Sequence, residues 1–321
     1  MIDNFKFIRE EHYNCLESVL VSLMATWEQE YILMFAQNWG FSFLPPENKS
    51  SKILGSRIGG GEYKVWECLS EFYGITPLFH KEEDTLQQLD ILRKELSQGM
   101  PVLLCLDAYY APWKDVCGKF HFEHYSLAIE KDDDFVYCID PFVNSLANPL
   151  PMKNFSQGNA KCITISRSED YSTNVDWKKL LQDAAKTILK EDENINGIQG
   201  MRAFADVVES SFDLRKEMEG FEEMIWVSPL ILRISDIGSR RLHFASVMKY
   251  LEQNYNTQDL SHFTSQIEKA GWGWRRIRRI LASACESQNP EQFTGELANE
   301  IKRLALLEEK VAQELLKFSR Q

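Results

Sequence analysis

A histidine and an aspartate flank a segment of this sequence that is expected to fold back on itself. His124 precedes one alternating stretch, 125–130, and Asp140 follows another, 135–139. The acidic stretch 131–134 between them is typical of a turn, because Asp side chains bond nearby backbone amides and tolerate turn geometry. In the resulting β-hairpin His124 lies opposite Asp140, or one position away, with Cβ atoms about 5 Å apart. An imidazole oriented by a carboxylate is the base of many enzymes that use a nucleophile.

The proline at position 141 gives the aspartate a second interpretation. Asp140-Pro141 would end the second strand, since proline removes a donor from the ladder, but the same dipeptide also begins plain turns. The match in register with His124 is what favours a catalytic role.

The nucleophile that this pair needs is expected at Cys15. Asn14 can cap a helix, and Glu17 stands in capping-box register with it. Apolar residues then recur at helical spacing, at Leu16, Val19, Leu20, Leu23, Met24 and Trp27. Cys15 therefore falls in the first turn, where helix amides, the macrodipole and a nearby imidazolium favour the thiolate. The alternative is that Cys15 is a small hydrophobic residue of the core.

Metal and phosphate binding are weaker interpretations of the same region and of a glycine run. His121 and His124 form an HxxH pattern with Cys117 ahead of it, but His121 falls on a loop and His124 on a strand, so we expect no metal site. The glycines at 59–61 lack both GK[ST] and a GxGxxG after a strand, so they predict a close backbone approach and no phosphate cradle. We expect no cofactor of the protein's own.

The elements that would position these groups are helices first and strands afterwards. The patterns predict helices over 15–27, 28–39, 62–73 and 86–96, and strands over 101–108 and 160–166 beside the hairpin. An aromatic loop over 109–113 leads into the hairpin, and it either lines a substrate channel or packs as an ordinary loop. This order is typical of an α+β domain. Polar composition over 167–174 divides the chain into a catalytic domain, 1–168, and a helical domain, 169–321.

Composition limits the classes of partner. The net charge is −12, from 36 basic and 48 acidic residues, which argues against general nucleic-acid binding. The 7 cysteines show no CxxC pairing and are expected to be reduced thiols of a cytoplasmic protein. No apolar run is long enough to span a bilayer, and the first residues do not form a signal peptide, so we expect no membrane contact.

A group of arginines is unusual in so acidic a chain. On a helix, residues three and four apart share a face, so these side chains could form one basic patch that meets an acidic partner. The alternative is a solvated or internally ion-paired face. The residues are Arg275, Arg276, Arg278 and Arg279.

Three segments, in this order, resemble the acyltransferase family named for the butirosin-biosynthesis H protein. They are HYNCLESVL near the start, GMPVLLCLDAYYAPW, and HFEHYSLAIEKDDDFVYCIDP, followed by a helical C-terminal half. The resemblance implies a papain-like cysteine-peptidase fold. The founding member moves an aminoacyl group from a carrier protein's phosphopantetheine thioester to an amine of an aminoglycoside. Carried over by position, Cys15 matches the nucleophile, His124 the base and Asp140 the orienting acid.

The chain departs from the family pattern around the oxyanion hole. The residue before the cysteine is often His in the family, and here it is Asn14. Papain-like enzymes place a Gln about six residues before the cysteine, where this chain has Arg9 and Glu10. The Asn14 side chain or the Cys15 amide is then the candidate donor.

These observations together predict a cysteine acyltransferase with a Cys15–His124–Asp140 triad. It would take an acyl, aminoacyl or peptidyl group from a carrier-protein thioester to a small-molecule amine, forming an amide or a ring, as in antibiotic and other natural-product biosynthesis. The arginine patch would receive the carrier protein. Two alternatives remain open: a papain-like hydrolase, either thioesterase or peptidase, and a non-catalytic binding protein on the same scaffold.

Overall fold

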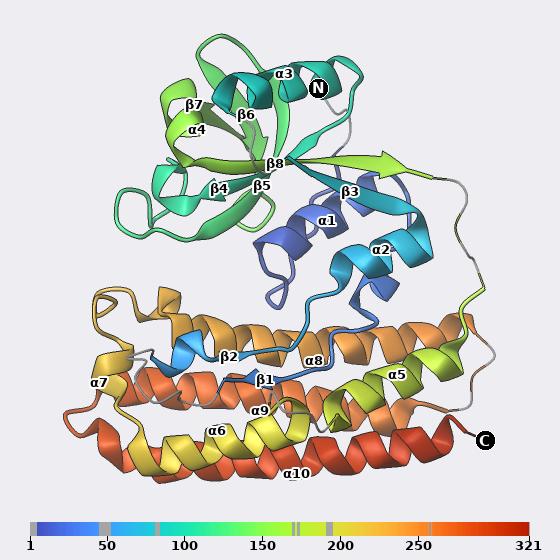
Figure 1. Cartoon of the computed structure of the whole chain (residues 1–321), viewed down its shortest axis with the longest axis vertical. Coiled ribbons are helices and arrows are strands. Elements are labelled where there is room, and N and C mark those ends of the chain that lie inside the picture. Colours follow the sequence, from blue (N-terminus) through green and yellow to red (C-terminus); the bar gives the residue numbers. More distant parts are fainter. Residues whose placement is uncertain are drawn as a thin grey trace. The chain divides into compact units, whose positions relative to one another are not determined.

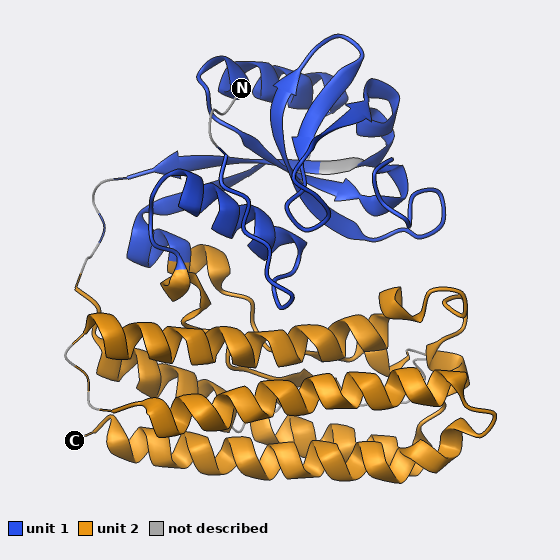
Figure 2. Cartoon of the chain, turned by 180° about the vertical axis from the view of Figure 1, so that it is seen from behind, with its two compact units in different colours: residues 1–31, 69–173 blue, residues 32–68, 174–321 orange. Residues whose placement is uncertain are grey.

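The chain folds into two compact units, one built around a sheet and one built of helices. The computed structural model describes residues 5–44, 53–80, 84–168, 171, 174–190, 195–255, 257 and 259–320 (Figure 1). The first unit comprises residues 1–31 and 69–173, and the second comprises 32–68 and 174–321 (Figure 2). Mixed α and β structure followed by a helical C-terminal region agrees with the predicted α+β class.

A six-stranded antiparallel sheet with the strand order β3-β8-β4-β5-β6-β7 forms the centre of the first unit. Helices α3 and α4 lie on one side of this sheet, and α1 lies on the other (Figure 1). The elements are α1 (Cys15–Thr26), β3 (Ile75–His80), α3 (Thr85–Ser97), β4 (Val102–Asp107), β5 (Glu123–Lys131), β6 (Phe135–Ile139), β7 (Ala147–Pro151), α4 (Met152–Gly158) and β8 (Asn159–Arg167). A 3-10 turn, η3 (Ala108–Tyr110), follows β4.

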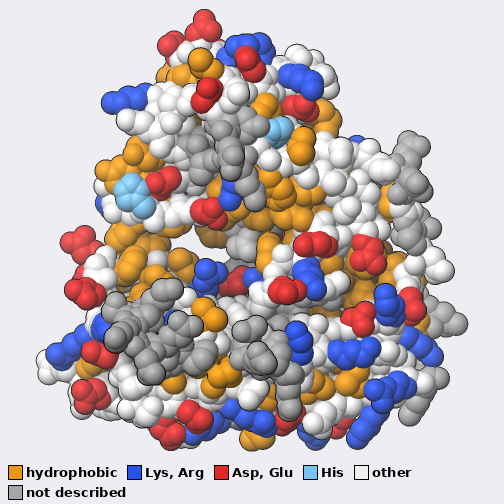
Figure 3. All heavy atoms as spheres, in the orientation of Figure 1, with side chains coloured by type: hydrophobic (Ala, Val, Ile, Leu, Met, Phe, Trp, Pro, Cys, Tyr) orange, Lys and Arg blue, Asp and Glu red, His pale blue; other side chains and the backbone are white. Residues whose placement is uncertain are grey.

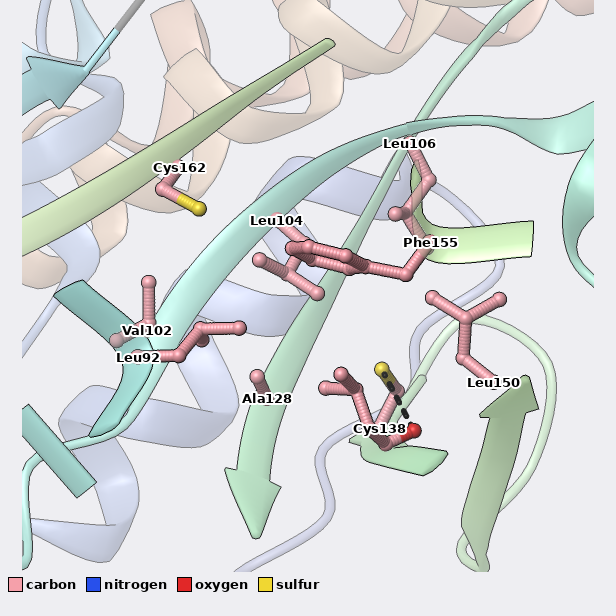
Figure 4. Packing of buried hydrophobic residues seen from close by; sticks show 10 residues of the cluster. Leu92, Val102, Leu104, Leu106, Ala128, Cys138, Leu150, Phe155 and Cys162 are labelled. Atoms are coloured by element: carbon pink, nitrogen blue, oxygen red, sulfur yellow. Dashed lines mark hydrogen bonds between the residues drawn. The ribbon is translucent and has the colours of Figure 1, made fainter. Parts of the chain in front are cut away.

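The core beneath α3 and α4 explains why β4 is apolar along its length. Val102, Leu104 and Leu106 face a cluster that includes Leu92 of α3 and Phe155 of α4, all at most 2% exposed (Figure 4). The residues between them are buried as well, so β4 is covered on both faces. Burying each large apolar side chain stabilises the fold by about 1.5–3 kcal/mol.

The predicted hairpin is confirmed as β5 and β6, but its register differs from the expected one. Leu127 pairs with Ile139 near the base, and Lys131 pairs with Val136 near the turn, with an irregularity between Ala128 and Glu130. Extending the base pairing places Ser126 opposite position 140. Asp140 is therefore a diagonal neighbour of His124. The register differs from the expected one because the turn is centred later in the chain. Diagonal pairs on one face remain within reach of long side chains.

Helices α5 to α10 make up most of the second unit. They are α5 (Trp177–Leu189), α6 (Gly197–Ser211), α7 (Leu214–Glu217), α8 (Pro229–Asn254), α9 (Ser261–Glu286) and α10 (Thr294–Phe318), with 3-10 turns η4 (Ile225–Val227) and η5 (Pro290–Phe293). The segment 32–68 adds η1 (Ile32–Phe35), β1 (Ser42–Phe43), η2 (Leu54–Ser56), β2 (Ile58–Gly59) and the start of α2 (Val65–Tyr73). No helix in the described part of the chain is both long and apolar enough to cross a bilayer.

The segment 32–68 departs from the predicted division of the chain, which gave it to the first domain. Its ties to the helices centre on Glu308, which is fully buried. One Glu308 oxygen accepts from Trp39 Nε1 at 2.8 Å and Arg241 Nη2 at 2.9 Å, and the other from Trp274 Nε1 at 3.0 Å and Arg241 Nε at 3.1 Å. The predicted helix over 28–39 is only the short turn η1.

The glycine run holds an arginine side chain. Arg240 Nη1 donates to the carbonyl oxygens of Gly60 at 3.2 Å, Gly61 at 3.3 Å and Glu62 at 3.2 Å. A Cβ atom at Gly60 would overlap the Arg240 side chain. The expectation of a close approach at these glycines is confirmed, and the carbonyls in contact suit a cation.

Candidate active site

The His124–Asp140 contact is the central feature of the site. His124 lies near the start of β5, and Asp140 directly follows β6. Their side chains are 2% and 0% exposed, and Nε2 of His124 lies 2.6 Å from Oδ2 of Asp140. Trp113 Nε1 donates to the same Oδ2 at 2.7 Å. The carboxylate thus holds the imidazole by Nε2, which leaves Nδ1 free to act as a base.

Cys15 lies at the start of α1, where the predicted capping box is confirmed. The Asn14 side chain accepts from the Glu17 amide at 2.9 Å, and the Glu17 carboxylate accepts from the Asn14 amide at 2.8 Å. The Cys15 thiol interacts with the His124 ring and with the backbone N–H of Tyr125. The structure therefore brings the three predicted residues into one chain of contacts.

The electrostatics of the three groups agree with one another. Burial opposes ionisation of Cys15, yet the pKa of its thiol is lowered, because the His124 imidazolium, the Tyr125 amide and the Lys114 ammonium favour the thiolate. Burial also opposes a charged His124, but the thiolate and Asp140 raise the pKa of the imidazole. The pKa of Asp140 is lowered despite burial by its bond to His124. Each direction favours a thiolate–imidazolium pair beside an ionised carboxylate.

Cys15 differs from the buried cysteines of the sheet. All 7 cysteines of the chain are free. Burial raises the pKa of Cys105 to about 11 and that of Cys138 to about 12. A raised pKa makes a thiol inert near neutral pH, whereas a lowered one marks a reactive position.

Two functional contacts come from the loop between β4 and β5. The aromatic loop was expected to line a channel or to pack, and Trp113 packs against the apolar cluster beside the sheet while its Nε1 bonds Asp140. Lys114 was not predicted at all, although its Nζ lies 3.3 Å from Nδ1 and 3.4 Å from Nε2 of His124. The only sequence signal for either residue is a position just ahead of the hairpin, because loop conformation leaves no periodic pattern.

The predicted oxyanion donor Asn14 uses its side-chain oxygen as a cap. The amides of Cys15 and Leu16, in the first turn of α1, have no intrahelical acceptor, as helix geometry requires. They are therefore suitable donors for an oxyanion. Arg9, near the position of the usual Gln, is exposed and donates to the Val143 carbonyl at 3.1 Å.

His121 does not join His124. Its Nδ1 lies 2.6 Å from Oδ2 of Asp107, and its ring stacks on Tyr109 with centroids 4.1 Å apart. Across the described residues no group of three His, Cys, Asp or Glu side chains could hold a metal ion.

The four arginines of α9 do not form one exposed patch. Arg275 is 8% exposed and lies over the Trp272 ring, so the prediction that it belongs to a docking surface is wrong. Arg278 is half-buried and lies over Trp226. The exposed members are Arg276, ion-paired with Glu296 at 3.1 Å, and Arg279. Successive side chains of a helix turn by about 100°, which separates these two pairs.

Basic and acidic side chains are interspersed on the face of the molecule that Figure 3 shows. No family model matches the chain, and no curated protein matches it significantly.

Proposed function

We propose that this protein is a cysteine acyltransferase that works through an acyl-enzyme at Cys15. The observation that carries the proposal is the chain of contacts from Cys15 through His124 to Asp140, with the pKa of the thiol lowered. The acyl, aminoacyl or peptidyl group comes from a carrier-protein thioester, and the acceptor is an amine. A nucleophile at a helix start beside a histidine on an antiparallel sheet also supports a papain-like fold and the family resemblance.

In the first half-reaction the thiolate of Cys15 attacks the thioester carbonyl. A C–S bond to Cys15 forms while the carbonyl electron pair moves to oxygen. The oxyanion then collapses, the bond to the carrier thiol breaks, and the leaving sulfur takes the proton from Nδ1 of His124. One thioester replaces another, so this step is nearly isoenergetic.

In the second half-reaction an amine attacks the acyl-enzyme. The C–N bond forms, the Cys15–carbon bond breaks, and His124 takes a proton from the nitrogen. The amide is more stable than the thioester, which drives the sequence forward. Water competes with the amine for the acyl-enzyme, so transfer requires that the loaded site exclude it.

Intact-mass spectrometry tests the proposal directly. The protein is mixed with an acyl carrier protein that bears a short acyl thioester, and then with a panel of primary amines. We expect a covalent adduct of the acyl mass, retained in Cys285→Ala and lost in Cys15→Ala, and an amide product when an accepted amine is present. Free acid with every amine would identify a hydrolase, and absence of adduct, amide and free acid alike would favour a binding protein.

The remaining features of the proposal are consistent with this chemistry. The free thiols support a reducing compartment such as the cytoplasm. The exposed Arg276 and Arg279 are the members of the arginine group that could contact an acidic carrier protein.

A further inference from the structure

Lys114 places a cation against the proposed catalytic pair, and among the described residues it has no carboxylate or carbonyl oxygen as an acceptor. Its Nζ is nearly equidistant from the two nitrogens of the His124 ring, at 3.3 and 3.4 Å. An in-plane position at these distances would overlap the ring carbon between the nitrogens, so the ammonium lies over the face of the ring. It also lies 5.4 Å from the centroid of Phe142. A protonated imidazole has no lone pair in the ring plane to offer it.

Burial makes it unfavourable for the Lys114 ammonium to stay charged without an ion-pair partner. Burial lowers the pKa of its ammonium, while the charges of Asp140, Cys15 and Asp115 favour the protonated form. Within the described part of the chain, no carboxylate comes within ion-pair distance of Nζ. A partly desolvated donor of this kind interacts strongly with any anion that reaches it.

Lys114 can stabilise the negative charge that moves from sulfur to the carbonyl oxygen during the reaction. Before attack the negative charge is on Cys15 Sγ, which has His124 and the Tyr125 amide as direct partners and Lys114 only as a nearby charge. After attack the charge is on the carbonyl oxygen, which enters the site without partners. A donor that bonds the oxygen but not the sulfur stabilises the transition state more than the resting state, which is the requirement for catalysis.

We propose that Lys114 is a catalytic residue whose ammonium donates a hydrogen bond to the oxyanion of the tetrahedral intermediate at Cys15. It works with the first-turn amides of α1 and replaces the side-chain donor that the neighbourhood of Arg9 and Glu10 lacks. The inference rests on the proposed function, since it assumes attack on a carbonyl. Lys114 keeps its proton throughout, and the bonds formed and broken are those described above.

The alternative is that Lys114 acts on the resting state alone, where its charge favours the Cys15 thiolate and offsets the charge of Asp140. The two roles differ in their dependence on the electrophile. Acylation passes through an oxyanion, whereas alkylation by iodoacetamide is a direct displacement at carbon and does not. A residue that only stabilises the thiolate affects both reactions equally, whereas an oxyanion donor affects acylation more than alkylation.

The experiment compares p-nitrophenyl acetate and iodoacetamide as probes of Cys15 in Lys114→Met, Lys114→Arg and Lys119→Met. Lys119 is an exposed lysine of the same loop and serves as the control. We expect Lys114→Met to slow acylation about 10²-fold while alkylation above the thiolate midpoint changes less than about threefold. Lys114→Arg should restore most of the acylation rate, and Lys119→Met should resemble the parent protein.

Equal losses in both reactions, or no loss in either, would overturn the role of Lys114. If Lys114→Met loses its cooperative thermal transition, Lys114→Gln is judged by the same ratio of rates. A parent protein that reacts with iodoacetamide but is never acylated would count against the proposed function itself.

Discussion

Nε2 of His124 lies 2.6 Å from Oδ2 of Asp140, and neither side chain is more than 2% exposed. A buried carboxylate at this distance fixes both the tautomer and the orientation of the ring. Nδ1 is then the nitrogen that can exchange a proton with Cys15. The contact therefore orients the ring for its proposed role as a base, and substitutions at Asp140 should change the reactivity of Cys15.

Asp140→Ala should reduce the acylation rate of Cys15 more than Asp140→Asn does. Asparagine keeps an oxygen that can accept from Nε2, but it lacks the charge that raises the pKa of His124. Alanine removes both, so we expect a moderate loss of acylation rate for asparagine and a loss of about 10²-fold or more for alanine. Single-turnover kinetics with p-nitrophenyl acetate measure both variants.

Asp107→Asn is the matched control, because Asp107 forms a second histidine–carboxylate pair in the sheet unit. Its acylation rate should stay close to that of the parent protein. An Asp140→Ala variant as fast as Asp107→Asn would show that the His124–Asp140 contact is structural only.

The pH dependence of alkylation should report the ion pair. The pKa of Cys15 is lowered, so alkylation by iodoacetamide should reach its midpoint below the ordinary thiol value of about 8.5. His124→Ala removes the main favourable partner while burial remains, so the midpoint should rise to about 8.5 or higher. The same midpoint in both proteins would contradict a thiolate–imidazolium pair.

Acyl transfer should follow a different profile. It needs the thiolate and also the imidazolium that protonates the leaving sulfur. The rate should rise as the Cys15–His124 pair forms and fall at higher pH, as the pair loses its remaining proton above the ordinary range of histidine. A stopped-flow series with a thioester probe would measure this bell-shaped pH dependence. A rate that never falls at high pH would exclude His124 as the acid.

Local features of the site were predictable from sequence because they depend on neighbouring residues. The capping box at Asn14 and Glu17 and the hairpin turn need only the side chains within a few positions. Register was less predictable, because the irregularity after Ala128 shifts every pairing beyond it by one residue. The contact between His124 and Asp140 survives this error because side chains on one face also meet diagonally.

Other features depend on contacts that no local pattern records. Trp113 and Lys114 reach the site from a loop, and Arg275 is buried although its neighbour Arg276 is exposed. Trp39 bonds Glu308 across 269 positions of the chain, which is why the segment 32–68 could not be assigned to the helical unit from sequence.

Trp113→Phe should reduce stability more than its loss of area suggests. The phenyl ring keeps most of the apolar contact but removes the N–H that bonds Asp140 Oδ2 at 2.7 Å. The Oδ1 atom of Asp140 already has no hydrogen-bond partner among the described residues. We expect a loss of about 1.5–3 kcal/mol in the free energy of unfolding, the usual contribution of a hydrogen bond to a charged group.

Urea denaturation measures this loss, with Trp226→Phe as the control. Trp226 is 48% exposed, and a phenyl ring can keep its contact with Arg278. The control should change stability by less than about 0.5 kcal/mol. Equal midpoints for the two variants would mean that the indole N–H does not support the carboxylate.

Glu308→Gln tests whether one buried carboxylate holds the second unit together. Arg241 is fully buried, and its guanidinium would keep hydrogen-bond partners but lose its counter-charge. Removing one partner of a buried pair costs about 3–5 kcal/mol, because an uncompensated charge remains.

Glu309→Gln, on the next residue, alters only the partly exposed pair with Arg202 and should cost at most about 1 kcal/mol. Because Trp39 also bonds Glu308, the segment 32–68 should become sensitive to protease in Glu308→Gln and not in Glu309→Gln. Identical unfolding midpoints for the two variants would show that packing, and not the buried charge pair, ties this segment to the helices.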